Sequence, residues 1–139
     1  KKGNVIHYIM GLITTESDID PAITQMIRKG ELKVEEGPQI KDIVLQIISH
    51  PELRSFYTSE NTVKNECEII TENGLILRPD RMVFKNNRVA IIDYKTGKKA
   101  KKYYEQIHTY ADALNAMGYL VENKIIVYID KKITPEFIN

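Results

Sequence analysis

Two aspartates and a lysine, Asp80, Asp93 and Lys95, are the residues whose types and spacing could do chemistry. Asp80 ends one β-like run and Asp93 and Lys95 end the next, with a turn at residues 85–88 between the runs. Residues two apart on a strand point to the same face, and a hairpin would bring Asp80 near Asp93 at the end away from the turn. Two carboxylates and an ammonium are costly to desolvate together, and a divalent cation would offset that cost.

Oxygen ligands suit hard cations, and Mg²⁺ typically keeps several waters while using one or two carboxylates. The two aspartates therefore predict a site for one or two ions of Mg²⁺ or Mn²⁺. Lys95 would lie beside the metal, where it could orient an attacking hydroxide or stabilise the charge of a pentavalent phosphorus. The alternative is a pair of ordinary salt bridges at the mouth of a sheet.

Residues elsewhere could complete this site. His7 lies one step round from the apolar face of a helix expected at residues 3–14, and its imidazole would shift the preference towards Mn²⁺. A hydrogen-bonded core histidine is the alternative. Glu66 and Glu68 share one face of the first expected strand, and either could reach the site or face the solvent.

Gln106 and Tyr110 are four apart and therefore neighbours on one helix surface. They could hold a phosphate and stack on a base, or they could be ordinary helix surface. Five lysines also fall within eight residues beside the Asp93 strand. These are Lys95, Lys98, Lys99, Lys101 and Lys102. Such a cluster could contact phosphates, and the alternative is a solvated helix start.

The elements that must position these residues follow from the periodicity of the apolar side chains. An N-terminal helical region, residues 1–60, is expected to hold helices at 3–14, 18–29 and 38–49, with one more turn at 52–57. An α/β core, residues 61–139, is expected to hold strands at 62–71, 75–84, 88–94 and 123–130 and a helix at 99–117. The helix between the third and last strands predicts that those two strands are parallel.

Composition bounds the class of protein. The 139 residues suit a single domain, and 42% hydrophobic with 28% charged residues is ordinary for a globular chain. The one cysteine, Cys67, excludes an internal disulfide and a four-cysteine cluster, which favours a reducing, cytoplasmic location. No apolar run approaches the length of a membrane span. The sequence opens on Lys1 without a methionine, so we expect a piece of a longer protein.

Four short motifs then follow one another along nearly the whole chain. They are Gly3-x-x-x-His7, Arg78-Pro79-Asp80-Arg81, Asp93-Tyr94-Lys95-Thr96 and Gln106-x-x-x-Tyr110. Together they resemble the PD-(D/E)XK nuclease superfamily, and within it the RecB-type nuclease domains at the C-terminus of UvrD/AddA-like helicase-nucleases. The resemblance implies a restriction-endonuclease-like α/β fold with a mixed sheet and a β-β-β-α-β core.

The resemblance also implies roles for individual residues. The implied metal ligands are His7, Asp80, Asp93 and the backbone carbonyl of Tyr94. Lys95 would be the catalytic lysine. Gln106 and Tyr110 would act on DNA or on the site, and Glu66 is the likelier match to an acidic residue on the family's first strand.

The sequence departs from the family pattern at two points. Arg78-Pro79 precedes Asp80 where many relatives have a glycine two residues before the aspartate, which could narrow the approach to the site. The cysteines that hold an iron–sulfur cluster in some relatives are absent, so no cluster is expected.

The function implied is a metal-dependent DNA nuclease, an exonuclease domain of a helicase-nuclease in DNA end processing and recombinational repair. The expected partners are DNA and helicase motor domains of the same parent chain, with no membrane. One alternative is an inactive nuclease fold retained for DNA binding. Another is an interaction domain whose charged strand ends form only salt bridges.

Overall fold

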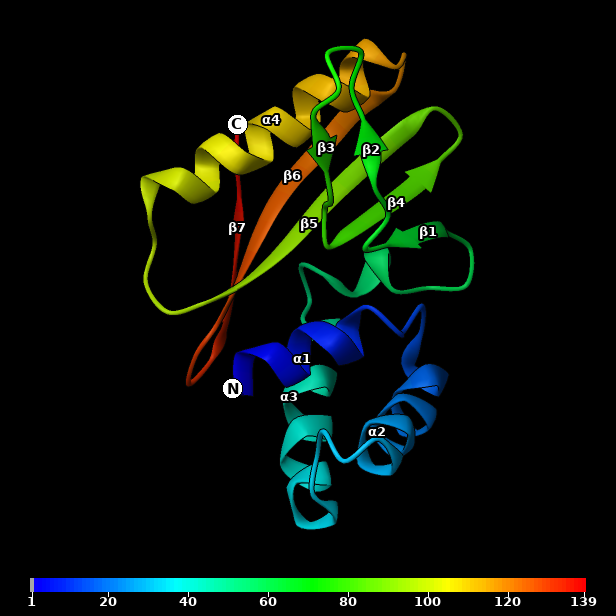
Figure 1. The fold of residues 1–139 in the computed structure, drawn as a ribbon, viewed down its shortest axis with the longest axis vertical. Helices are drawn as coiled ribbons and strands as arrows, with labels where there is room; N and C mark the ends of the chain where they lie inside the picture. Colours follow the sequence, from blue (N-terminus) through cyan, green and yellow to red (C-terminus); the bar gives the residue numbers. More distant parts are fainter. Residues whose placement is uncertain (1) are drawn as a thin grey trace. The chain divides into compact units, whose positions relative to one another are not determined.

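The computed structural model of the chain describes residues 2–139, and of Lys2 the backbone only. It contains two compact units, which divide between residues 60 and 61. The first unit is helical and the second holds the sheets (Figure 1). None of the described helices is long and apolar enough to cross a membrane.

The first unit consists of three α-helices and three short 3₁₀ turns. The α-helices are α1 (Lys2–Met10), α2 (Ile19–Arg28) and α3 (Gly37–Ile48). The 3₁₀ turns are η1 (Glu16–Asp18), η2 (Val34–Glu36) and η3 (Arg54–Phe56), the last lying in the extra turn predicted at 52–57. The three α-helices contact one another and bury their apolar stripes, as with Ile9, Ile23 and Val44.

The second unit is built on a five-stranded mixed sheet. Its strands are β1 (Thr62–Asn65), β4 (Arg81–Lys85), β5 (Arg88–Thr96), β6 (Leu120–Ile129) and β7 (Ile133–Phe137), in the order β1-β4-β5-β6-β7. The β5–β6 pair is parallel and the other pairs are antiparallel. A small hairpin of β2 (Ile69–Ile70) and β3 (Ile76–Leu77) forms a second sheet. The predictions of a mixed α/β fold and of parallel strands around the crossover helix are confirmed.

Two strand predictions were wrong in detail, and one strand was not predicted. The run at 62–71 breaks at Glu66, whose φ is 53°, and continues as β2 in the other sheet. The run at 75–84 also breaks, because residues 78–80, which include Pro79, lie between β3 and β4. A strand beyond residue 130 was not predicted. This strand, β7, contains Pro135. The proline is tolerated because β7 is an edge strand that pairs only with β6.

Helix α4 (Lys101–Ala116) covers the face of the sheet that carries the candidate site. Its predicted inner stripe, Ile107, Ala111 and Leu114, is buried in one cluster with Val89 and Ile91 of β5. Side chains alternate along a strand, so Asp93 and Lys95 continue the row of Val89 and Ile91 on the α4 face. The same packing that forms the core therefore brings α4 over the two charged residues.

Candidate active site

The carboxylates of Asp80 and Asp93 join the two chain segments that carry them through backbone hydrogen bonds. The backbone N–H of Asp80 donates to Asp93 Oδ1 at 3.1 Å, and the backbone N–H of Tyr94 donates to Asp80 Oδ2 at 2.8 Å. The first paired residues of the hairpin, Arg81 and Ile92, lie directly beside them. The hairpin thus brings the two aspartates together, although Asp80 precedes β4 and does not end a strand as predicted.

Burial makes negative charge on this pair of carboxylates energetically unfavourable. Asp93 is 3% exposed, whereas Asp80 is half-buried. Burial first, and then the charge of Asp80, raise the pKa of Asp93 to about 7 against the opposing effect of Lys95. A divalent cation would stabilise two adjacent carboxylates, and hard oxygen donors match Mg²⁺ or Mn²⁺, so the residues fit such an ion.

The pair does not stand in a larger cluster of metal-binding side chains. Among residues 2–139, no group of three or more histidine, cysteine, aspartate and glutamate side chains is arranged to hold an ion. Water and backbone oxygens can supply further ligands to an ion bound by Asp80 and Asp93, as is common for Mg²⁺. The predicted Tyr94 carbonyl ligand belongs to that backbone.

Lys95 is held by three neighbours at the end of β5. Its Nζ lies 3.2 Å from Asp93 Oδ2 and donates to Gln106 Oε1 at 2.8 Å. The ammonium also lies 4.8 Å from the centre of the Tyr103 ring, within the range of a cation–π contact. Its side chain is 19% exposed. We call Asp80, Asp93 and Lys95 together the Asp–Lys corner.

The two helix residues predicted from their spacing are placed differently. Gln106 accepts a hydrogen bond from Lys95 and so positions the lysine. Tyr110 is 6% exposed, and the pKa of its hydroxyl is raised by burial first and then by the charges of Asp93, Asp80 and Glu66. Its burial favours a role in supporting the carboxylates over stacking on a base.

Glu66 lies beside Asp80 because the chain turns sharply there. Its backbone N–H donates to the carbonyl of Asp80 at 3.0 Å. Its carboxylate lies 3.6 Å from Arg78 Nε, which also donates to the Glu66 carbonyl at 3.0 Å. Glu68, two residues on, is exposed. The break between β1 and β2, which the sequence did not reveal, separates these two glutamates.

His7 belongs to the helical unit, on α1. Its Nδ1 lies 3.0 Å from the carbonyl of Gly3, the glycine of the same motif. A carbonyl only accepts, so Nδ1 carries the proton and a neutral ring presents its lone pair at Nε2, the arrangement found in metal-binding histidines. Its role as a ligand stays a prediction.

The predicted lysines gather at the end of β5 and the start of α4. Lys98, Lys99, Lys101 and Lys102 are all exposed. Lys99 Nζ lies 3.3 Å from Glu136 Oε1, and Lys102 Nζ lies 5.7 Å from the Tyr103 ring centre.

Sequence reasoning missed Tyr103, although it is three residues before Gln106 and thus on the same helix surface. It also missed Lys131 and Lys132, which lie between β6 and β7. Without a prediction of β7, nothing in the sequence indicated that these lysines lie in a turn beside the sheet.

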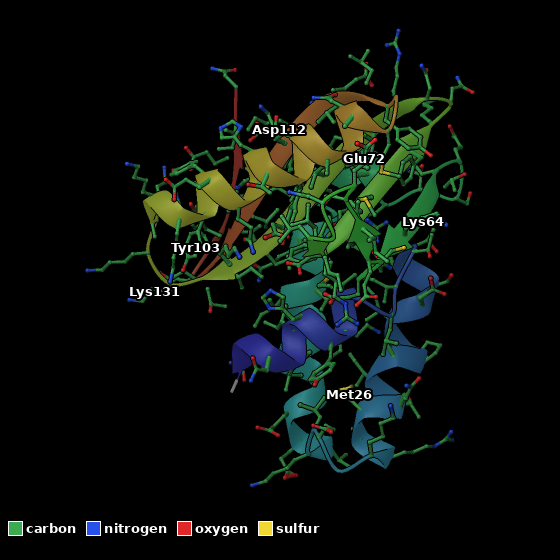
Figure 2. The ribbon with its side chains drawn as sticks, turned by 45° about the horizontal axis from the view of Figure 1, so that its top comes forward. Met26, Lys64, Glu72, Tyr103, Asp112 and Lys131 are labelled. Carbon is green, nitrogen blue, oxygen red and sulfur yellow. The ribbon has the colours of Figure 1, made fainter. Side chains whose placement is uncertain are left out.

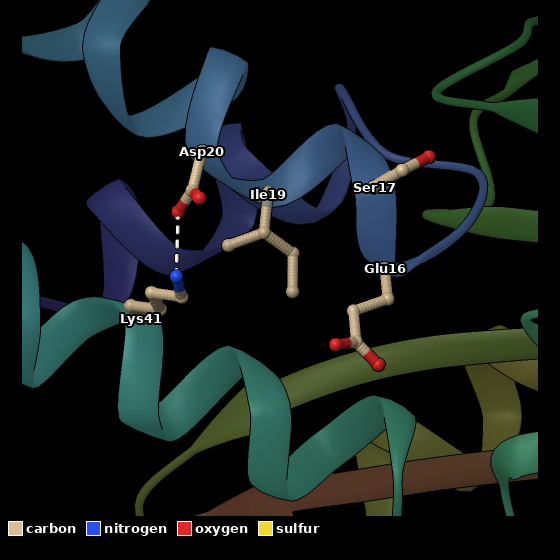
Figure 3. A pocket seen from close by; sticks show the side chains of 5 residues that line it. All are labelled: Glu16, Ser17, Ile19, Asp20 and Lys41. Atoms are coloured by element: carbon tan, nitrogen blue, oxygen red, sulfur yellow. Dashed lines mark ion pairs between the residues drawn. The ribbon is translucent and has the colours of Figure 1, made fainter.

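The first unit has a hollow of its own, of about 390 Å³ (Figure 3). The exposed ion pair between Lys41 Nζ and Asp20 Oδ1, at 2.8 Å, lies at its edge. Glu16, Ser17 and Ile19 complete its lining. Exposed pairs of this kind contribute little to stability, and nothing in the hollow resembles the Asp–Lys corner.

A mixed sheet that ends in a carboxylate pair and a fixed lysine is the arrangement of metal-dependent nucleases. The chain belongs to the PD-(D/E)XK nuclease superfamily, whose family model matches residues 1–136. Members of this superfamily share a restriction-endonuclease-like fold and typically use divalent metal ions.

Among solved structures, the chain is similar to the one described as "Crystal structure of SSO0001", with 20% identity and a TM-score of 0.38. The match covers 90% of this chain and 65% of that chain. No curated protein matches the chain.

Proposed function

We propose that this chain is an exonuclease domain that hydrolyses DNA phosphodiesters with Mg²⁺ or Mn²⁺. The single observation that carries the proposal is the Asp–Lys corner. There Asp93 accepts from the Asp80 N–H, Asp80 accepts from the Tyr94 N–H, and Lys95 Nζ lies 3.2 Å from Asp93 Oδ2. A pure DNA-binding module would need neither a buried carboxylate pair nor a lysine aligned with it. The alternative function is an inactive DNA-binding module, which would bind metal without cleaving DNA.

The residues of the Asp–Lys corner would have different roles in the reaction. Asp80 and Asp93 would hold the ion, which when bound supplies a water of lowered pKa and neutralises charge on the phosphate. Lys95 would donate a hydrogen bond to a non-bridging phosphate oxygen as negative charge develops there. Gln106 and Tyr103 hold the ammonium in place. The buried ring of Tyr110, close enough for Asp93 and Asp80 to raise the pKa of its hydroxyl, would help to exclude water near the carboxylates.

The wider context of the proposal comes from the motif order. We propose that residues 1–139 act as one nuclease domain of a cytoplasmic helicase-nuclease that processes DNA ends in recombinational repair. The G-x-x-x-H and Q-x-x-x-Y motifs support this RecB-type assignment, and His7 would complete the ligand set. A motor in the parent chain would feed the strand to the Asp–Lys corner.

Calorimetric titration with Mn²⁺ tests the metal site. We expect binding to the wild type and at least a tenfold loss of affinity in Asp93→Ala. Unchanged affinity in this variant would place the ion elsewhere and remove the corner from the mechanism.

Degradation of end-labelled linear DNA with Mn²⁺ tests catalysis, with Lys95→Ala as the inactive variant. Lys85→Ala is the matched control, because Lys85 is an exposed lysine at the opposite end of the β4–β5 hairpin. Equal rates in wild type and Lys95→Ala would indicate a contaminant. Cleavage of circular DNA at the same rate as linear DNA would contradict the exonuclease assignment, and metal binding without any cleavage would favour the inactive module.

A further inference from the structure

A groove lies beside the Asp–Lys corner on the face of the sheet that α4 covers. The strand register places Lys95 of β5 next to Tyr128 of β6, and Tyr128 next to Thr134 of β7. Side chains of paired residues share a face, and neighbouring strands are about 4.8 Å apart, so this row runs from Lys95 to the edge of the sheet. Tyr128 and Thr134 line a groove of about 520 Å³.

The two banks of the groove come from two separate turns at the same end of the sheet (Figure 1). Lys98 and Lys99 follow β5 on one bank, and Lys131 and Lys132 follow β6 on the other. Asp130 is the acidic residue of the lining, so four lysines face one aspartate. Lysines gathered around one hollow attract an extended anion.

The floor of the groove is formed by the ring of Tyr128. Tyr128 is 6% exposed, and its hydroxyl lies beside the Tyr104 hydroxyl, which donates to Glu136 Oε1 at 2.8 Å. Lys99 Nζ lies 5.9 Å from the centre of the Tyr128 ring, so a lysine of one bank lies against this floor.

We propose that this groove binds the sugar–phosphate backbone of one DNA strand, with Lys131 and Lys132 as phosphate contacts. The inference rests on the proposed function. A DNA strand with its scissile phosphate at Lys95 must continue across one of the β-strands that neighbour β5. The row from Lys95 through Tyr128 provides that path. Phosphates along the DNA would contact the lysines of both banks.

Fluorescence anisotropy with labelled oligothymidylate in EDTA tests the groove without cleavage. In Lys131→Gln/Lys132→Gln we expect at least a fivefold loss of affinity at low salt. The slope of log affinity against log salt should also become shallower by about 1.4, because each phosphate contact to a single strand contributes about 0.7.

The matched control is Lys64→Gln/Lys85→Gln, which removes the same charge. Lys64 is on β1, at the opposite edge of the sheet from β7 (Figure 2), and Lys85 is at the far end of β4. The control should leave the salt slope unchanged. All four lysines are exposed, so the variants should fold, and circular dichroism would check this.

An unchanged slope in Lys131→Gln/Lys132→Gln overturns the proposal, as does an equal change in the control. Equally tight binding of polyglutamate, lost in the same variant, would overturn it in favour of an acidic protein partner. Acetylation of Lys131 and Lys132 that oligothymidylate blocks would support it. Because these readouts need no metal, groove binding without cleavage would contradict the proposed function alone, and cleavage without groove binding would contradict this inference alone.

Discussion

Gln106 and Lys95 are joined by a hydrogen bond of 2.8 Å from Nζ to Oε1, which links helix α4 to the end of strand β5. The bond fixes an ammonium that would otherwise sample many rotamers. A glutamine oxygen is neutral, so it orients the lysine without competing with Asp93 for its charge. Gln106 is therefore a positioning residue, and its effect should appear in turnover.

Removing this hydrogen bond should lower turnover more than substrate binding. A hydrogen bond to a charged group contributes about 1.5–3 kcal/mol, so Gln106→Leu should lower kcat roughly 10- to 100-fold. Steady-state kinetics on linear DNA would measure kcat and KM separately. The control Asn115→Ala lies on the exposed last turn of α4 and should have no effect. A rise in KM with kcat unchanged would instead indicate that Gln106 contacts DNA.

The Tyr103 ring should matter for its π face and not for its hydroxyl. Lys95 Nζ lies 4.8 Å from the ring centre, and such contacts contribute about 0.5–2 kcal/mol. Tyr103→Phe keeps the ring and should stay within about twofold of wild-type turnover, whereas Tyr103→Leu should lose several-fold. Equal losses in both variants would assign the effect to the hydroxyl.

The stability of the metal-free protein should decrease as pH rises between about 4 and 7. The folded-state pKa of Asp93 is raised to about 7, above the ordinary unfolded value, so the folded protein binds the extra proton in this window. The free energy of unfolding should fall by at most about 1.4 kcal/mol per pH unit. Urea unfolding in EDTA across this range measures the slope.

Two comparisons make this pH dependence specific to Asp93. Asp93→Asn removes the titrating carboxyl but can still accept from the Asp80 N–H, so it should flatten the slope and stabilise the metal-free protein at pH 7 and above. Mn²⁺ should restore stability to the wild type at high pH and have little effect on the variant. A slope that persists in Asp93→Asn would mean that another group titrates.

Asp18 should stabilise the 3₁₀ turn η1, which leads into α2. Its carboxylate accepts from the backbone N–H groups of Thr14 at 2.8 Å and Thr15 at 3.1 Å, and these bonds lower its pKa. Asp18→Ala should therefore reduce the free energy of unfolding by about 1 kcal/mol at pH 7. The stabilisation is present above the ordinary carboxyl pKa and is lost as pH falls through the lowered value.

Asp20→Ala provides the comparison for Asp18→Ala. Asp20 is an exposed aspartate in an ion pair with Lys41, and such pairs are worth about 0–1 kcal/mol. Denaturant unfolding of the two variants at pH 7 should rank Asp18→Ala as the less stable. Equal stability would show that the backbone hydrogen bonds of Asp18 do not hold the turn.

Local spacing determined much of the second unit. Strand alternation placed Asp93 and Lys95 on one face, helix periodicity identified the buried stripe of α4, and the intervening helix implied parallel β5 and β6. All three depend on residues close together in the chain, where the side-chain period of each element decides which face is buried.

Only the tertiary structure decided what meets across elements. It set the burial that raises the Asp93 pKa and the contacts of Gln106 and Tyr103 with Lys95. It also set the sharp turn at Glu66 that ends β1. It also added β7, which completes the lysine-lined groove. These features arise from how α4 and separate strands pack against one another, and packing between distant segments leaves no periodic signal within any one of them.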